Sequence, residues 1–192
     1  PDHIPFPPWI KKGLSTGLQY HKTENLLTRM GIDTICRQAN CPNQRECWAI
    51  GTATVLILGT ICTRNCPFCS VSHGIPERPD SEEPNRIAEL SRELALQYLV
   101  ITSVDRDDLS DGGASQFKEV VDTCRKVNPS MRFELLVPDF KHVQKRALEI
   151  LDPVLPFVFG HNVETVPELY AIARPGGDYE RSLQLLSLAR QR

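Results

Sequence analysis

Six of the seven cysteines lie between positions 36 and 69, and they fall into two groups of three. The first triplet has the spacing C-x4-C-x5-C and the second C-x3-C-x2-C: Cys36, Cys41, Cys47 and then Cys62, Cys66, Cys69. The sequence carries no secretion signal, and in a reducing compartment clustered thiols are more often metal ligands than disulfides. Both triplets therefore predict metal sites. The remaining Cys124 lies on the apolar side of a predicted helix, so we expect it in the core.

The second triplet suits an iron-sulfur cluster better than a zinc site. Three thiolates at this spacing can bind three irons of a four-iron cubane, which leaves one iron open to a small chelating ligand. The spacing differs from the ferredoxin run and from the paired C-x2-C knuckles of zinc sites. The alternative is that only Cys66 and Cys69 act, as half a zinc site or as a redox dithiol.

Apolar runs that alternate with helical segments must position these cysteines. Buried strands are predicted at residues 54–58, 98–101 and 133–137 and within 153–159. Helices are expected to begin at 81–84, 110–113 and 141, and to cover 164–173 and 179–190. This alternation indicates right-handed βαβ units on a parallel sheet. The predicted fold class is α/β, a partial (β/α) barrel of about four units, since a complete eight-unit barrel takes about 250 residues.

The N-terminal quarter of the chain has a different composition. Residues 1–50 are rich in Pro and Gly and show little apolar periodicity beyond a short helical stretch at 23–30. We expect a loop-rich extension over 1–50 that carries the first triplet, followed by the barrel over 51–192. Parallel α/β folds place their chemistry beyond the carboxyl ends of the strands, and the second triplet directly follows the first predicted strand.

Charge and hydropathy exclude several classes of protein. Lys and Arg number 22 and Asp and Glu 24, which gives a net charge of −2 and no basic excess for a nucleic-acid backbone. The longest apolar runs, such as residues 55–58, are far too short to span a bilayer. We expect a cytoplasmic protein with no nucleic-acid or membrane partner.

The second triplet resembles the signature of the radical S-adenosylmethionine (radical SAM) superfamily, including the aromatic Phe68 directly before the last cysteine. The resemblance implies a [4Fe-4S] cluster whose open iron is chelated by the amino and carboxylate groups of S-adenosyl-L-methionine. Reduction of the cluster then releases a 5′-deoxyadenosyl radical, which can abstract hydrogen from an unactivated carbon. No side chain is singled out as catalytic.

The first triplet narrows the resemblance, because its spacing looks like the auxiliary-cluster motif of lipoyl synthases. Further segments match that family along nearly the whole chain: 51–54, 101–109, 111–114, 138–140, 161–166 and 181–183. Lipoyl synthases insert two sulfur atoms, at C6 and C8 of an octanoyl chain held on a lysine of a carrier protein. The resemblance implies a second [4Fe-4S] cluster at the first triplet, dismantled as the sulfur source.

The same resemblance implies macromolecular partners. These are octanoylated lipoyl-carrier proteins, namely E2 domains of dehydrogenase complexes and the glycine cleavage H protein, and a low-potential electron donor such as ferredoxin or flavodoxin. Two alternatives stay open at this point. One is another radical SAM sulfur-inserting enzyme of the methylthiotransferase type, and the other is a non-catalytic iron-sulfur or metal-binding module.

Cofactor contacts are expected at the strand ends. Ser103 and Asp105 end the second predicted strand, where superfamily members bind the amino-acid part of the cofactor, and Phe68 is expected to contact the adenine. The alternative is a solvated acidic turn that caps the next helix, which suits the other acids of this loop: Asp107, Asp108 and Asp111.

Other candidates follow the later strands. Glu134 lies inside an otherwise apolar strand, so we expect either a ligand contact or an Arg partner for its carboxylate. After the fourth strand, Asn162 is expected to contact the cofactor and His161 to be a hydrogen-bonded structural residue. Residues 174–177 either contact the cofactor carboxylate or end a helix.

The resemblance extends to the end of the chain. Lipoyl synthases continue beyond the point that matches Arg192, with further βα units and a C-terminal Arg-Ser-Ser-Tyr motif whose serine is the fourth ligand of the auxiliary cluster. Neither feature is present in this sequence. We therefore expect a C-terminally truncated part of a longer protein.

Overall fold

The computed structural model describes residues 17–49 and 54–192. The Pro-rich start of the predicted extension, the expected boundary at residues 50 and 51 and the first residues of the matching segment 51–54 lie outside the described residues. Within the described ranges, no helix combines the length and the apolar character that a bilayer crossing requires.

Four parallel strands form the central sheet, in the spatial order in which they occur along the chain: β1 (Thr54–Ile57), β4 (Tyr98–Ser103), β5 (Arg132–Leu136) and β6 (Val158–Gly160). One register row crosses the whole sheet, through Val55, Ile101, Leu135 and Phe159. Each crossover contains a helix, as the alternating pattern predicts. The prediction of a partial (β/α) barrel is confirmed, and the described residues close no barrel.

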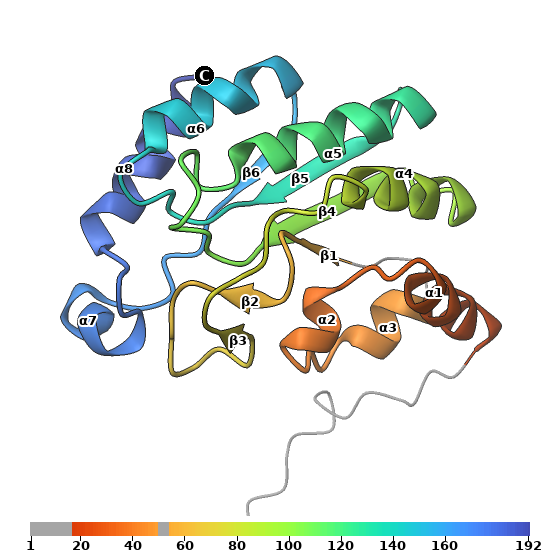
Figure 1. Ribbon diagram of the computed structural model, residues 1–192, viewed down its shortest axis with the longest axis horizontal. Coiled ribbons are helices and arrows are strands. Elements are labelled where there is room, and N and C mark those ends of the chain that lie inside the picture. The colour runs from red at the N-terminus through yellow and green to blue at the C-terminus, as the bar shows by residue number, and fades with distance from the viewer. Residues whose placement is uncertain (1–16, 50–53) are drawn as a thin grey trace, which may run out of the picture.

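One layer of helices covers one face of this sheet (Figure 1). It comprises α4 (Glu83–Glu93), α5 (Ala114–Val127), α6 (Gln144–Leu151) and α8 (Tyr179–Arg190). In α5 the predicted apolar face is buried at four positions: Phe117, Val120, Val121 and Cys124. The core position predicted for Cys124 is therefore confirmed. Val127 was expected on the same face but is 42% exposed, because the helix ends there.

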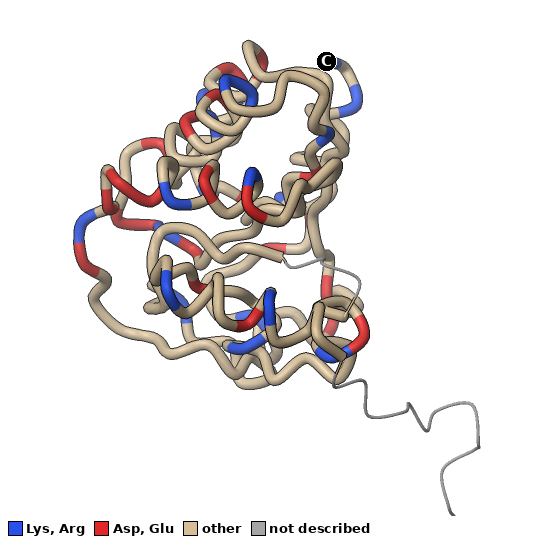
Figure 2. The backbone as a smooth tube through the Cα atoms, turned by 90° about the vertical axis from the view of Figure 1, so that its right-hand side faces the viewer, with Lys and Arg blue, Asp and Glu red and all other residues tan. Residues whose placement is uncertain are grey.

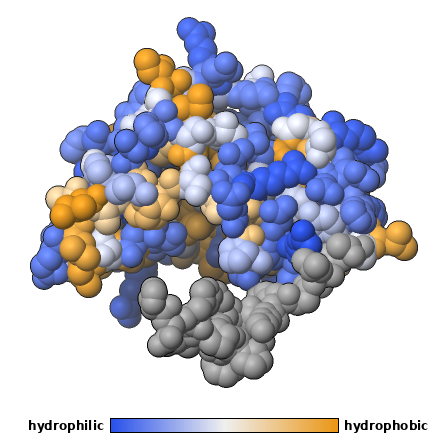
Figure 3. Space-filling model, turned by 90° about the horizontal axis from the view of Figure 1, so that it is seen from below, coloured by the Kyte–Doolittle hydropathy of each residue, from blue (hydrophilic) through white to orange (hydrophobic). Residues whose placement is uncertain are grey.

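Two predicted segments have different bounds in the structure. Residues 153 and 154 belong to a 3₁₀ turn, η2 (Asp152–Val154), so the fourth strand begins only at Val158. The segment predicted as a helix over 164–173 contains η3 (Pro167–Leu169) and the short α7 (Tyr170–Ala173). Its apolar side chains Val166, Leu169 and Ile172 are exposed. Figure 3 shows apolar surface at the left of the molecule, which is the side on which α7 lies in Figure 1.

The extension packs against β1 and shares the core of the sheet. It contains α1 (Leu18–Arg29), α2 (Ile35–Gln38) and α3 (Gln44–Ala49). Thr34 forms an antiparallel bridge with Val55, and the Leu56 N–H donates to the Asp33 carbonyl at 2.9 Å. Leu27 and Trp48 are fully buried in the same hydrophobic cluster as the strands. The first triplet is thus fixed beside the first strand of the sheet.

Candidate active site

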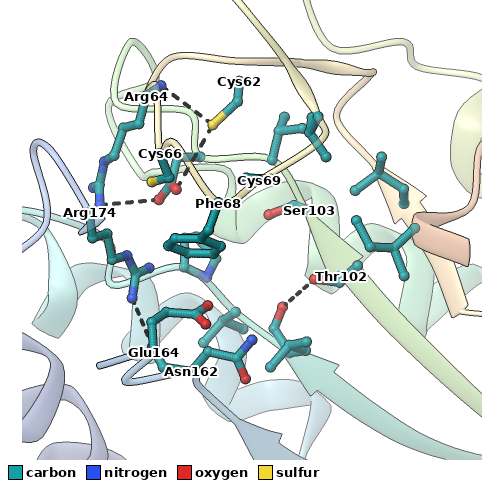
Figure 4. A pocket seen from close by; sticks show the side chains of 18 residues that line it. Cys62, Arg64, Cys66, Phe68, Cys69, Thr102, Ser103, Asn162, Glu164 and Arg174 are labelled. Carbon is teal, nitrogen blue, oxygen red and sulfur yellow. Dashed lines mark hydrogen bonds and ion pairs between the residues drawn. The ribbon is translucent and has the colours of Figure 1, made fainter. Parts of the chain in front are cut away.

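A pocket of about 140 Å³ opens at the carboxyl ends of the strands, and Figure 4 shows its walls. The three cysteines of the second triplet line it together with residues from the ends of β4, β5 and β6. Of the cofactor contacts expected from the sequence, four are pocket residues: Phe68, Ser103, Asp105 and Asn162. The pocket therefore gathers residues from four successive strand-to-helix loops.

The second triplet belongs to a short excursion of the chain between β1 and α4. Cys62 ends β2 (Ile61–Cys62), which pairs in parallel with β3 (Ser72–His73). Two backbone hydrogen bonds shape the loop, from the Cys69 N–H to the Cys66 carbonyl at 3.0 Å and from the Gly74 N–H to the Cys62 carbonyl at 2.9 Å. The loop thus folds back on itself and turns its cysteines toward the strand ends.

The surroundings of Cys62 and Cys66 keep these two thiols protonated when no metal is bound. Burial raises the pKa of Cys62, and burial together with the Asp105 carboxylate raises that of Cys66 to about 11. Metal binding must therefore release protons from this loop. Among the described residues, no three His, Cys, Asp or Glu side chains are arranged around a single ion. A four-iron cubane requires a different arrangement of the cysteines, because each thiolate binds a different iron.

Ser103 and Asp105 bring buried polar atoms without hydrogen bonds to the pocket. The Ser103 Oγ and the Asp105 Oδ1 are buried and have no hydrogen-bond partner among the described residues. Arg64 Nη1 lies 3.4 Å from that Asp105 oxygen, and the Cys62 thiol lies 3.9 Å from the other one. Burial raises the pKa of Asp105, although Arg64 and Arg174 oppose the shift. Buried polar atoms normally have partners, so these two fit a ligand that carries donors such as an ammonium group.

The opposite wall of the pocket comes from the loop after β6. Arg174 is only 6% exposed, and its Nη1 donates to the Asn162 carbonyl at 2.7 Å and to the Tyr170 hydroxyl at 3.3 Å. Asn162 and Glu164 also line this wall. Figure 4 shows Phe68 between this wall and the cysteines, and its side chain is 55% exposed. Arg174 is therefore a pocket residue, a point that the sequence left open.

Glu134 does not line this pocket. Its carboxylate accepts a hydrogen bond from the Tyr98 hydroxyl at 2.6 Å, so its partner is a neutral side chain rather than the Arg that the sequence analysis offered. A contact between Glu134 and the cofactor stays a prediction. The structural role predicted for His161 is confirmed by the 2.9 Å hydrogen bond between its Nδ1 and the Val137 carbonyl.

The first triplet lies on the short helices of the extension. Cys36 is buried in α2, Cys47 is half-buried in α3, and the Cys41 N–H between them donates to the Cys36 carbonyl at 3.0 Å. None of these cysteines lines the pocket, but Ile35 does, directly before Cys36. The first triplet thus adjoins the pocket wall, and none of the seven cysteines, all of which lie in the described ranges, forms a disulfide.

Arg64 is the main functional candidate that the sequence analysis missed. Its side chain is 3% exposed and pairs with Asp107 and Asp139, both at 2.7 Å from Nη2. Asp107 was interpreted as a solvated capping acid, which is wrong, because it binds this buried arginine. The same interpretation is confirmed for Asp111, whose carboxylate accepts from the N–H groups of Gly113 and Ser115. Acidic residues after two neighbouring strands were the signal that a buried cation should lie between them.

Comparison of the sequence with known proteins shows which proteins this chain is similar to. A family model of the radical SAM superfamily matches residues 56–192. The chain is 50% identical over 186 residues to a lipoyl synthase of Desulfotalea psychrophila, a match that covers 97% of this chain and 62% of that protein. It is 48% identical to the lipoyl synthase of Methylococcus capsulatus, over 97% of this chain and 58% of that protein. The corresponding match in Haemophilus influenzae strain Rd is 50% identical, over 96% of this chain and 58% of that protein. The chain thus spans about 60% of the length of the curated relatives that it matches.

Proposed function

The chain belongs to the radical SAM superfamily, and we propose that it acts in lipoyl synthesis. The proposed reaction is the S-adenosylmethionine-dependent insertion of two sulfur atoms, at C6 and C8 of a protein-bound octanoyl chain. The observation that carries this proposal is the 50% identity to a lipoyl synthase over 97% of the chain. The pocket supports it, because the second triplet and the polar strand ends meet there.

The residues present fit the superfamily's cofactor. Cys62, Cys66 and Cys69 would hold a [4Fe-4S] cluster, and Ser103 and Asp105 would receive the ammonium group of S-adenosyl-L-methionine. When bound, this pair supplies a carbon-centred radical that can remove hydrogen from an unactivated carbon.

The opposite wall would bind the rest of S-adenosyl-L-methionine. Arg174 offers a buried cation to the carboxylate, and Asn162 offers an amide. Phe68 would pack against the adenine, because its exposed ring projects into the pocket (Figure 4). These contacts would hold the reacting sulfonium in one orientation.

The walls of the pocket also exclude water from the reaction. Leu56, Val104 and Val137 are nearly or fully buried and line it. Such an apolar wall would limit the access of solvent to the site, and exclusion of solvent prevents side reactions of a reactive intermediate.

The first triplet would hold the auxiliary [4Fe-4S] cluster as the source of sulfur. Its place beside the pocket, where Ile35 lines the wall next to Cys36, suits that role. Under this proposal the partners are octanoylated lipoyl-carrier proteins and a reduced ferredoxin or flavodoxin, and the reaction takes place in the cytoplasm. Residues 1–50 and 51–192 would then serve as the auxiliary-cluster extension and the radical-generating barrel.

An anaerobic assay tests the proposed function directly. The reconstituted protein is mixed with S-adenosyl-L-methionine, dithionite and an octanoylated carrier peptide, and the peptide is weighed by mass spectrometry. The expected result is release of 5′-deoxyadenosine and a gain by the peptide of the mass of two sulfur atoms, because each of two C–H groups becomes C–SH under the reducing conditions.

Other outcomes favour the alternatives. Release of 5′-deoxyadenosine with no change in the peptide would point to another sulfur-inserting radical enzyme. Zinc in place of iron, with no cleavage of S-adenosyl-L-methionine, would leave a metal-binding module.

A further inference from the structure

The two residues that follow Cys62 fasten the cysteine loop to the neighbouring strand end. The Thr63 N–H and hydroxyl both donate to the Asp105 carbonyl, at 3.0 and 2.9 Å. The same hydroxyl accepts from the Asp107 N–H at 3.1 Å. Thr63 therefore links the backbone of the loop by hydrogen bonds to the segment that contains Asp105. Asp105 is itself a proposed cofactor contact.

Arg64 adds a buried ionic connection to the same segment. Its Nε and Nη2 donate to the two carboxylate oxygens of Asp107, at 2.9 and 2.7 Å. Its Nη1 faces Asp105 Oδ1 at 3.4 Å. The backbone N–H of Arg64 donates to the Cys62 sulfur at 3.4 Å. The side chain thus contacts two acids beyond β4, and the backbone of the same residue contacts a proposed cluster ligand.

The connection extends to the next strand through Asp139. This aspartate is fully buried after β5, and it accepts from Arg64 Nη2 at 2.7 Å and from Arg181 Nε at 3.1 Å. Arg181 lies in the first turn of α8. Figure 2 shows acidic and basic residues interspersed along the backbone. The cysteine loop, the ends of β4 and β5 and the start of α8 are therefore held by one ionic network.

Only a guanidinium can make these contacts together. Its nitrogens form a planar fork that reaches carboxylates on different loops at once, whereas a lysine offers one ammonium on a flexible stem. The side chain is too deeply buried for water to replace a lost contact, since it is 3% exposed. The position of Arg64 is thus set by shape as well as by charge.

We propose that Arg64, assisted by Thr63, is a positioning residue that sets where the thiolates of the second triplet stand relative to Ser103 and Asp105. That a cluster and its cofactor lie between the thiolates and the strand-end residues rests on the proposed function. The placement of the thiols by Arg64 does not depend on it. Displacement of the loop would separate the cluster ligands from the strand-end contacts that must bind the same cofactor.

The metal-free protein gives the first test. Alkylation of each cysteine by iodoacetamide is followed by mass spectrometry in the wild type, R64K and D139N. We expect both variants to raise the alkylation rate of Cys62 and Cys66 several-fold and to leave Cys124 unchanged. The matched control is R125K, since Arg125 lies in α5, donates to the Pro156 carbonyl at 3.1 Å and does not line the pocket.

The reconstituted protein gives the second test. Iron content, the electron paramagnetic resonance spectrum of the reduced cluster and its response to S-adenosyl-L-methionine are measured for the same proteins. We expect R64K to keep its iron but to bind S-adenosyl-L-methionine roughly tenfold to a hundredfold more weakly, with a smaller spectral response. D139N should change in the same direction but less, because Asp107 still holds the arginine. R125K should match the wild type.

The outcomes separate this proposal from the proposed function. If R64K matches the wild type in thiol alkylation and in its response to S-adenosyl-L-methionine, or if R125K changes both as much, the positioning role is wrong. If the wild type itself binds no iron, the proposed function fails, while the alkylation rates still decide whether Arg64 places the thiols.

Discussion

At the scale of single residues, the pocket contains polar groups that folding alone does not use. The Ser103 Oγ and the Asp105 Oδ1 are buried without hydrogen bonds among the described residues. A buried group without a hydrogen bond costs about 1–3 kcal/mol of stability, a cost that a bound ligand can offset. These two atoms therefore mark where a ligand completes the structure.

Ser103→Ala separates binding from stability. Removal of an unpaired hydroxyl should leave the free energy of unfolding unchanged or raise it by up to about 1 kcal/mol. The affinity for S-adenosyl-L-methionine should fall about tenfold, since a hydrogen bond to its ammonium group is lost. Urea unfolding of the metal-free protein and equilibrium binding to the reconstituted protein measure the two effects. A variant that loses stability and keeps its affinity would make Ser103 a structural residue.

The two triplets should lose iron independently. Cys66→Ser and Cys41→Ser are each expected to lower the iron content from about eight to about four atoms per chain, because each removes a ligand from one proposed cubane. Iron and sulfide assays after anaerobic reconstitution measure this loss. Cys124→Ala is the control, because Cys124 lies in the hydrophobic core and should affect stability alone. Equal iron in all the variants would exclude these ligand sets.

The sequence predicted the residues that line the pocket better than it predicted the ion pairs beside the pocket. Phe68, Ser103, Asp105 and Asn162 were found because each stands at a fixed place relative to a motif or a strand end. Arg64 was missed although it lies between two cysteines of the motif. Its partners lie 43 and 75 residues away along the chain, and only the folded chain brings them together.

At the scale of elements, the turn that ends β1 directs the chain toward the cysteine loop. Leu58 and Gly59 both have positive φ, at 68° and 84°. The Glu83 carboxylate accepts from the Leu58 N–H, and Arg106 Nη1 donates to the Leu58 carbonyl at 3.2 Å. Two charged side chains thus satisfy the polar groups of a residue in a left-handed conformation, which leucine alone would avoid.

Gly113→Ala should destabilise the protein more than Gly59→Ala. Both glycines have positive φ, which costs an alanine about 1–2 kcal/mol. A Cβ at Gly113 would also stand 2.3 Å from Leu58 Cδ1, whereas a Cβ at Gly59 meets nothing within 4 Å. We therefore expect Gly113→Ala to lower the free energy of unfolding by a further ~1–3 kcal/mol. Urea unfolding curves of the two variants measure the difference, and equal losses would show that the contact with Leu58 carries no cost.

At the scale of the whole molecule, Asp139 lies where three parts of the chain meet. Burial alone would raise its pKa, but the Arg64 hydrogen bond and charge, the Lys141 N–H and the Arg181 charge outweigh burial and hold the pKa at about 2. An aspartate with a lowered native pKa binds protons more weakly in the native than in the unfolded state. Its stabilising effect is therefore complete above about pH 4 and is lost as the pH falls toward 2.

Asp139→Asn should reduce the loss in the free energy of unfolding that occurs as the pH falls from 4 to 2. In the wild type this group accounts for about 2 kcal/mol of the free energy of unfolding lost between pH 4 and pH 2. The variant should lack that part of the slope and be about 3 kcal/mol less stable at neutral pH, because Arg64 loses a buried partner. Urea unfolding at a series of pH values measures both effects. Asp108→Asn is the control, since the Asp108 side chain is 39% exposed and its loss should cost under about 1 kcal/mol. Parallel curves for the wild type and Asp139→Asn would contradict the assignment.

The order of the sheet was predictable because the strands are apolar on both faces and the crossovers are short. Those features allow only a right-handed series of parallel neighbours. The short helices at the first triplet were not predictable, since their stability comes from packing against β1 through residues such as Trp48 rather than from a periodic pattern.

The sequence by itself determined the two cysteine triplets, the alternation of strand and helix and the edge of the sheet where the chemistry lies. These features depend on spacing along the chain, and spacing is local. Only the tertiary structure decided which charges meet, that Arg64 joins Asp107 to Asp139 and that Arg174 faces the pocket. The physical reason is that ion pairs between loops depend on strand register and on burial, which exist only once the sheet has formed.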